Sequence, residues 1–217
     1  MMPVLFLIAG YFFGSFSTGY FLGKKQGHDI QTEGSGNIGT TNALRTMGKG
    51  AGLITFLGDL AKAFIPTLLV RFLYCNAMGY GSDLTYVITL ITGLGVFIGH
   101  IFPFYLHFKG GKGIAVSAAV IIATSADGGL GVWMIFIGIA LFAAIVAITK
   151  YVSLGSLAVM WYFPIYCILK FRGDQYFWFA FGVGLIFLTL SYIKHAGNIR
   201  RLIDGTERKI TFKGEKK

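Results

Sequence analysis

The chain has 217 residues, of which 55% are hydrophobic and only 13% charged. This composition is typical of a polytopic membrane protein and excludes a soluble enzyme built around one large core. The formal net charge of +10 would suit a nucleic-acid-binding protein, but most of the 19 Lys and Arg residues lie in short polar stretches between apolar segments. We therefore expect no nucleic-acid partner, and instead anionic substrates and anionic membrane lipid.

Seven apolar segments are candidates for transmembrane helices, which need about 20 residues each. Segment 114–126 gives only about 20 Å of helix at ~1.5 Å per residue, so its full crossing is left open. We expect an all-α fold and a single integral membrane domain over residues 1–217. The expected spans are about 3–23, 51–72, 84–107, 114–126, 130–149, 152–169 and 176–193.

The positive charges predict the orientation of these helices. Lys24 and Lys25 directly follow the first segment, and most other Lys and Arg residues fall in stretches on the same side of the membrane. The positive-inside rule then places the N-terminus outside and the C-terminus in the cytoplasm. Three polar, glycine-containing stretches share the cytoplasmic face. The first segment also carries small residues spaced for close helix packing, namely Gly10, Gly14, Ser15, Gly19 and Gly23.

The first polar stretch, residues 34–50, is the strongest candidate for a phosphate site. Its glycines let consecutive backbone N–H groups converge on an anion. A helix with Thr40 or Thr41 as its N-cap would add partial positive charge, and two cations follow at helical spacing. The residues expected to bind or support a phosphate here are Gly34, Ser35, Gly36, Asn37, Asn42, Arg45 and Lys49.

Two nucleotide-binding interpretations of this stretch are excluded. Its Gly-x-Gly-x-x-Gly spacing matches the dinucleotide fingerprint, but that motif requires a β-strand before it, and here a membrane segment precedes it. A P-loop would require Ser or Thr after Lys49, where this chain has Gly50. A flexible linker has no need of two asparagines and an arginine at helical spacing.

Asp59 and Lys62 lie well inside the second apolar segment, where insertion of each costs ~2.5–3.5 kcal/mol. At positions i and i+3 they can pair with each other, or they can brace the polar site from beneath. Both interpretations stay open.

The second polar stretch surrounds Pro103, which is expected to disrupt the third helix and turn His100 toward polar groups. A second anion-binding loop follows, and His107 is expected to be an interfacial side chain. The residues expected to bind or support an anion in this loop are Lys109, Gly111 and Lys112.

The third polar stretch places His195, Asn198 and Arg201 on one helical face. Gly205 is expected to end that helix and let Glu207 fold back. The alternative is an amphipathic basic tail on anionic lipid, which suits the residues after position 208.

Other candidate sites are weaker. Cys75 and Cys167 lie at the ends of apolar segments without metal-ligand spacing, so their role is open, and we expect no metal and no cofactor. His28 and Glu33 approach an acyltransferase His-x-x-x-x-Asp signature, but the acid and its surroundings differ, which favours chance.

Taken in order, the three polar stretches resemble the motifs of the PlsY family of bacterial membrane glycerol-3-phosphate acyltransferases. The resemblance implies acyl transfer from acyl phosphate to position 1 of glycerol 3-phosphate, giving 1-acyl-glycerol 3-phosphate and phosphate, without acyl-CoA. It also implies a place in the bacterial inner membrane, with the active site on the cytoplasmic face. The matching residues are 34–45, 100–104 with 108–113, and 195–201 with 205–207.

Two phosphate-bearing substrates bring about four negative charges together at neutral pH. We expect Ser35, Arg45 and Lys112 to bind phosphate groups, with Asn37, Asn42 and Asn198 orienting oxygen atoms. The candidate bases are His100, His195 and Glu207, or a substrate phosphate that takes the proton itself. The expected supporting residues are Gly34, Gly36, Lys49, Asp59, Lys62, Lys109, Gly111 and Arg201.

Two other functions fit the sequence less well. A transporter of phosphorylated solutes would show inverted repeats around a midplane site, and no such repeat is found in the sequence. A lipid-binding structural protein would leave the glycine-rich loops unexplained. The acyl-chain preference and oligomeric state are open, although the lack of a soluble domain favours a monomer.

Overall fold

The computed structural model describes residues 2–125 and 128–210. All regular elements in these ranges are helical, which confirms the all-α class. The chain separates into two compact units, Met1–Asp127 and Gly128–Lys217. The single domain expected over the whole chain stays a prediction.

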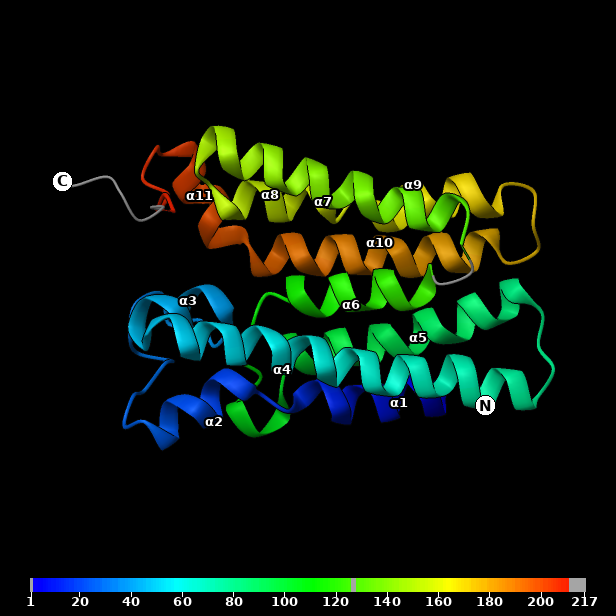
Figure 1. Cartoon of the computed structure of the whole chain (residues 1–217), viewed down its shortest axis with the longest axis horizontal. Helices are drawn as coiled ribbons and strands as arrows, with labels where there is room; N and C mark the ends of the chain where they lie inside the picture. The colour runs from blue at the N-terminus through cyan, green and yellow to red at the C-terminus, as the bar shows by residue number, and fades with distance from the viewer. Residues whose placement is uncertain (1, 126–127, 211–217) are drawn as a thin grey trace. The chain divides into compact units, whose positions relative to one another are not determined.

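The first unit is built around helix α5, whose residues from Thr85 to Ile101 are almost all buried. Helices α1, α4 and α6 pack against it (Figure 1). The elements of this unit are α1 (Met2–Ser15), α2 (Thr18–Lys25), α3 (Thr40–Thr46), α4 (Gly48–Leu68), a π-helix η1 (Leu69–Cys75), α5 (Ser82–Ile101), a 3₁₀ turn η2 (Phe104–Leu106) and α6 (Ile114–Thr124).

Small residues bring α1 and α5 into backbone contact. A Cβ at Gly14 would collide with the backbone of Val96, and a Cβ at Gly99 would collide with the carbonyl of Tyr11. Such glycines let two helices approach closely enough for extensive van der Waals packing. The close packing predicted for Gly10 and Gly14 is confirmed.

The first apolar segment contains a break that the sequence did not predict. Helix α1 ends at Ser15 and α2 starts at Thr18. The Tyr105 hydroxyl donates to the carbonyl of Ser15 and accepts from the amide of Ser17, both at 3.0 Å. Lys62 Nζ donates to the carbonyl of Phe16 at 2.7 Å. These side chains replace lost helical hydrogen bonds, which is the condition for irregular backbone at membrane depth.

Six helical stretches in the described chain are long and apolar enough to cross a membrane. The shorter α6 ends at Thr124, whose carbonyl accepts a hydrogen bond of 3.4 Å from the buried Arg71. A full crossing by the expected segment 114–126 stays a prediction. The six stretches are Met2–Lys25, Gly48–Cys75, Ser82–Leu106, Leu130–Thr149, Val152–Phe171 and Phe177–Lys194.

In the second unit, α7 packs on α8 and α9, and α9 packs on α10 (Figure 1). The rings of Phe163 and Phe187 stack across α9 and α10 with centroids 4.1 Å apart. The helix expected over 152–169 is interrupted at Met160 and Trp161, where the Trp161 indole donates to the Tyr192 hydroxyl at 3.0 Å. The elements are α7 (Leu130–Thr149), α8 (Val152–Val159), α9 (Tyr162–Phe171), α10 (Phe177–Lys194) and α11 (Ala196–Ile203).

Candidate functional site

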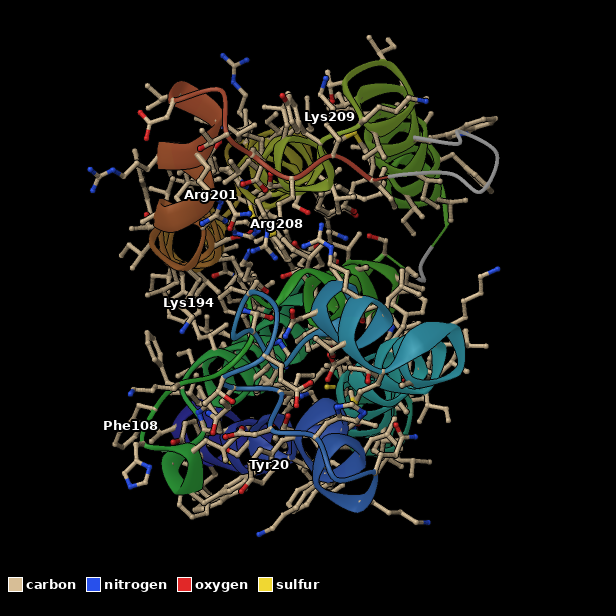
Figure 2. All side chains as sticks on the ribbon, turned by 90° about the vertical axis from the view of Figure 1, so that its left-hand side faces the viewer. Tyr20, Phe108, Lys194, Arg201, Arg208 and Lys209 are labelled. Atoms are coloured by element: carbon tan, nitrogen blue, oxygen red, sulfur yellow. The ribbon has the colours of Figure 1, made fainter. Side chains whose placement is uncertain are left out.

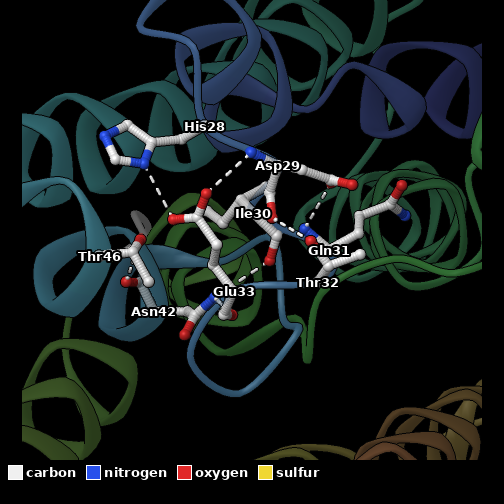
Figure 3. A network of polar contacts seen from close by, with 8 residues as sticks. All are labelled: His28, Asp29, Ile30, Gln31, Thr32, Glu33, Asn42 and Thr46. Carbon is white, nitrogen blue, oxygen red and sulfur yellow. Dashed lines mark hydrogen bonds and ion pairs between the residues drawn. The ribbon is translucent and has the colours of Figure 1, made fainter.

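Asn42 organises the first polar loop from the buried face of α3. Its amide nitrogen donates to the carbonyls of Ile30 and Glu33, at 3.2 and 3.0 Å (Figure 3). Its amide oxygen accepts from the backbone N–H of Ser35 at 2.8 Å. With 2% of its surface exposed and both amide atoms engaged, Asn42 shapes the loop that presents Ser35.

The glycines of this loop are required by its backbone. Gly34 and Gly36 have φ values of +62° and +70°, in the left-handed region that favours glycine. A Cβ at Gly34 would also collide with the amide oxygen of Asn42. The loop therefore depends on glycine for both its turn and its contact with α3.

Helix α3 begins one residue earlier than expected. Its N-cap is Gly39, and the side chain of Asn37 accepts from the Gly39 N–H at 2.9 Å. Thr40 is thus the first helical residue, and the prediction of Thr40 or Thr41 as N-cap was wrong because Asn37 turns the chain before the helix. Since α3 has only seven residues, its dipole is small, and the predicted anion site depends mainly on the cations.

A second set of contacts ties down the start of the same loop (Figure 3). His28 Nδ1 lies 2.9 Å from one carboxylate oxygen of Glu33, and the other oxygen accepts from the Asp29 N–H at 3.1 Å. The side-chain amide of Gln31 donates to the carbonyl of Lys109 at 3.3 Å. The first and second polar loops are therefore neighbours in the folded first unit.

The predicted phosphate-binding cations of the first unit lie on these two loops or the helices beside them. Arg45 is exposed in the last turn of α3, and Lys49 is exposed in the first turn of α4. Lys109 is exposed and Lys112 is half-buried just before α6. Their binding of substrate stays a prediction.

The second loop folds back over the end of α5. The N–H of Gly110 donates to the carbonyl of Ile101 at 3.2 Å, and the N–H of Gly111 donates to the carbonyl of His100 at 3.1 Å. A Cβ at Gly111 would collide with Nε2 of His100. Helix α5 ends at Ile101, before Pro103, as predicted. The loop thus covers the ring edge of His100 that carries Nε2.

Asp59, Lys62 and His100 form a buried polar cluster inside the first unit. Lys62 Nζ lies 3.0 Å from Asp59 Oδ1 and 2.7 Å from His100 Nδ1. The side chains of all three residues are about 5% exposed. Lys62 therefore pairs with Asp59, as the first interpretation predicted, and it also contacts His100 in the last turn of α5. That this pair supports a substrate site stays a prediction.

In the second unit, Glu207 folds back as expected and accepts hydrogen bonds from three side chains. Its donors are Asn198 at 2.6 Å, Arg201 at 2.8 Å and Ser153 at 2.8 Å. Partial burial raises the pKa of Glu207, but the hydrogen bonds from these donors outweigh it and hold the pKa below its ordinary value. Glu207 is therefore ionised and engaged at neutral pH. Sequence reasoning missed Ser153, because the serines of an apolar segment gave no signal.

His195 lies between α10 and α11 and is 2% exposed. Its Nδ1 lies 2.8 Å from the carbonyl of Ser191. A carbonyl oxygen accepts only, so Nδ1 carries a proton, and in the neutral ring Nε2 carries the lone pair. This arrangement suits a proton acceptor.

The end of the second unit that faces the viewer in Figure 2 carries Lys194, Arg201, Arg208 and Lys209. Lys209 Nζ lies 5.6 Å from the ring centroid of Tyr151, within the range of a cation–π contact. The lipid-binding tail predicted after position 208 lies mostly outside the described residues.

Comparison with known proteins gives one consistent result. The family model described as glycerol-3-phosphate acyltransferase matches residues 4–205. A glycerol-3-phosphate acyltransferase of Geobacter sulfurreducens is 37% identical, over 97% of this chain and 99% of the relative. One of Clostridioides difficile is 39% identical, over 98% and 97%.

Solved structures agree with the sequence relatives. The crystal structure of PlsY, an integral membrane glycerol 3-phosphate acyltransferase, in its glycerol 3-phosphate form has a TM-score of 0.79 and 28% identity, over 96% of both chains. A lysophosphatidic acid form of PlsY gives a TM-score of 0.77 over 96% of this chain and 95% of that one.

Proposed function

The chain belongs to the glycerol-3-phosphate acyltransferase family of PlsY type, and from this premise we propose the reaction that it catalyses. It transfers a fatty acyl group from acyl phosphate to the hydroxyl at position 1 of glycerol 3-phosphate. The products are 1-acyl-glycerol 3-phosphate, which is lysophosphatidic acid, and inorganic phosphate.

The observation that carries this proposal is the pair of adjoining glycine loops in the first unit. The Gln31–Lys109 hydrogen bond joins them, and Arg45 and Lys112 flank them with positive charge. A phosphate monoester carries nearly two negative charges at neutral pH. Charge-assisted hydrogen bonds from cations and oriented N–H groups are strong, and they bring two such anions to reaction distance.

The acyl phosphate already contains a good leaving group. The protein therefore has to orient the two substrates and stabilise the transition state, and it does not have to activate the acyl donor. The glycerol 3-phosphate hydroxyl oxygen attacks the acyl carbonyl carbon and forms the ester bond. The bond from that carbon to the phosphate oxygen breaks, and phosphate leaves with its electron pair. Cations and N–H donors stabilise the oxyanion formed on the carbonyl oxygen during the transfer.

The hydroxyl proton needs an acceptor, and the hydrogen bonds of the three candidate bases narrow the choice of acceptor. Glu207 is held ionised by three donors, which weakens it as a base. Nδ1 of His100 is occupied by the Lys62 ammonium. The proposal therefore assigns the proton to Nε2 of His195 or to a phosphate oxygen of the substrate.

The deciding assay uses purified full-length protein in nanodiscs with radiolabelled glycerol 3-phosphate. The acyl donor is either palmitoyl phosphate or palmitoyl-CoA. We expect labelled lysophosphatidic acid only with palmitoyl phosphate. Product with palmitoyl-CoA alone would overturn the assigned donor, and no lipid product with either would overturn the function.

Charge removal tests the loops directly. Arg45→Ala and Lys112→Ala are each expected to lower kcat/KM by at least about 100-fold, since each removes a charge-assisted contact to phosphate. Lys25→Ala, which removes an exposed lysine at the end of α2, is the matched control and retains activity. Turnover near wild type in Arg45→Ala or Lys112→Ala, with folded protein in the membrane, would contradict the charge-based mechanism.

We also propose seven crossings in one domain of the bacterial inner membrane, with an external N-terminus, a cytoplasmic C-terminus and a monomeric chain. The excess of Lys and Arg in alternate stretches supports this topology. Thr32→Cys and Gly173→Cys, each made in a background without Cys75 and Cys167, test this topology by labelling with a membrane-impermeant thiol reagent. We expect labelling of intact cells only at position 173, and labelling at position 32 would contradict the topology.

A further inference from the structure

Lys62 has no hydrogen-bonding capacity left for a substrate. A lysine ammonium has three N–H donors and no acceptor. Lys62 Nζ lies 2.7 Å from the Phe16 carbonyl, 3.0 Å from Asp59 Oδ1 and 2.7 Å from His100 Nδ1. Each partner takes one donor, so this lysine binds other groups of the protein and not a substrate.

The same contacts decide which nitrogen of His100 carries the proton. Because the ammonium only donates, Nδ1 of His100 must accept, and the proton of the neutral ring lies on Nε2. A proton on Nδ1 would have to be directed at Asp59 Oδ1, which at 3.6 Å is beyond hydrogen-bonding distance. A doubly protonated ring would place a second cation against Lys62 in a buried site, which is strongly unfavourable.

The protonated nitrogen faces the second polar loop. A Cβ at Gly111 would collide with Nε2 of His100, so glycine alone lets the loop backbone reach this ring edge. The loop is held there by the Gly111 N–H, which donates to the His100 carbonyl at 3.1 Å. The residue that follows in the loop is Lys112, the predicted phosphate ligand.

From this geometry we propose that Asp59 and Lys62 are positioning residues that fix His100 as a neutral Nε2–H donor to a phosphate oxygen bound at the 110–112 loop. The inference rests on the proposed function and adds a role to it. His100 then binds an anionic oxygen and does not accept the hydroxyl proton. The phosphate belongs to glycerol 3-phosphate or to acyl phosphate, which share this chemistry.

The first test reads the protonation state of the ring directly and needs no catalysis. Full-length protein with ¹⁵N-labelled histidine is placed in nanodiscs, and His100 is assigned by the signal lost in His100→Gln. We expect a neutral ring with the proton on Nε2. In Lys62→Met the donor to Nδ1 is gone while Asp59 remains, so we expect the proton on Nδ1 or a charged ring. The exposed Lys25→Met is the control and leaves the signal unchanged.

A wild-type His100 that is doubly protonated, or protonated on Nδ1, would overturn the proposal. So would a Lys62→Met spectrum identical to wild type. Because the spectrum is recorded without substrate, the proposal stays testable even if the assay with palmitoyl phosphate and palmitoyl-CoA gives no lipid product.

The second test compares two amides at position 100, which also guards against misfolding of Lys62→Met. Glutamine places an amide N–H near the position of Nε2, whereas asparagine reaches only the position of Nδ1. We expect His100→Gln to stay within about fivefold of wild-type kcat/KM. We expect His100→Asn to raise one KM about tenfold or more, with a smaller change in kcat, because it loses a hydrogen bond to a charged group.

Measuring KM separately for glycerol 3-phosphate and palmitoyl phosphate shows which phosphate binds at the loop. Equal loss of kcat in the glutamine and asparagine variants, with both KM values unchanged, would overturn the proposal and make His100 the proton acceptor.

Discussion

His100 in the first unit and His195 in the second are oriented by opposite kinds of partner. The Lys62 ammonium donates to Nδ1 of His100, whereas Nδ1 of His195 donates to the carbonyl of Ser191. The neutral rings therefore present different groups on Nε2, a proton in His100 and a lone pair in His195. The contact behind each ring, rather than the residue type, decides what a histidine offers to a substrate.

Among the tests of this comparison, the largest expected effect comes from removing the Nε2 lone pair of His195. His195→Gln replaces Nε2 with an amide donor and is expected to lower kcat by about 100-fold or more, the usual contribution of a general base. Steady-state kinetics with palmitoyl phosphate measures it, with thermal melting as the check on folding. Activity within threefold of wild type would leave a substrate phosphate as the proton acceptor.

The next largest effect is expected from one of two glycine-to-alanine substitutions, one in each unit. Gly111→Ala drives a methyl group into the His100 ring, and displacement of the loop by about 1 Å is expected to cost roughly 10- to 100-fold in kcat/KM. In Gly197→Ala the new Cβ meets only Arg201 Nη1, at 3.5 Å. That variant is expected to keep activity within about twofold, with equal or higher melting temperature, because alanine favours a helix. Equal losses in both variants would refute the contact argument.

The pH dependence of stability tests the second unit alone. The pKa of Glu207 is lowered in the folded protein from its ordinary value of 4.5, so its contribution to stability is fully present above pH 4.5 and is lost as the pH falls through the lower folded value. Melting curves between pH 3 and 7 are therefore expected to show a smaller acid-induced loss in Glu207→Gln than in wild type. Parallel curves would mean that the contacts of Glu207 add nothing to folding.

The smallest expected effect concerns the His28–Glu33 pair. Both side chains are more than a third exposed, and such pairs contribute about 0–1 kcal/mol. His28→Ala is expected to change kcat/KM by less than about twofold in the same acyltransferase assay. A loss of 100-fold would instead make this pair a catalytic His–carboxylate dyad.

Apolar length predicted the six long apolar helices, because a run of uncharged residues has one stable form in lipid, the hydrogen-bonded helix. Apolar length does not predict a helix break where a distant side chain replaces the backbone hydrogen bonds. The break at residues 16–17 depends on Tyr105 and Lys62, and neither contact leaves a mark on the local sequence. The interruption at Met160 and Trp161 was missed as well.

The candidate site likewise has features that the sequence predicts and features that it does not. Local geometry was predictable, as in the turns at Gly34 and Gly36 and the return of Glu207 after Gly205. Long-range partners were not, because Lys62 and His100 are 38 positions apart and Ser153 and Glu207 are 54 apart. The sequence therefore identified the polar residues but not which of them act through one another.

The break between α1 and α2 bears on how the protein is made. The carbonyl of Phe16 and the amide of Ser17 depend on Lys62 and Tyr105, which follow 46 and 88 positions later in the chain, on the next two spans. A backbone with such open groups is costly in hydrocarbon. The first three spans therefore reach their final form as one late, joint event, and not as finished helices that dock one after another.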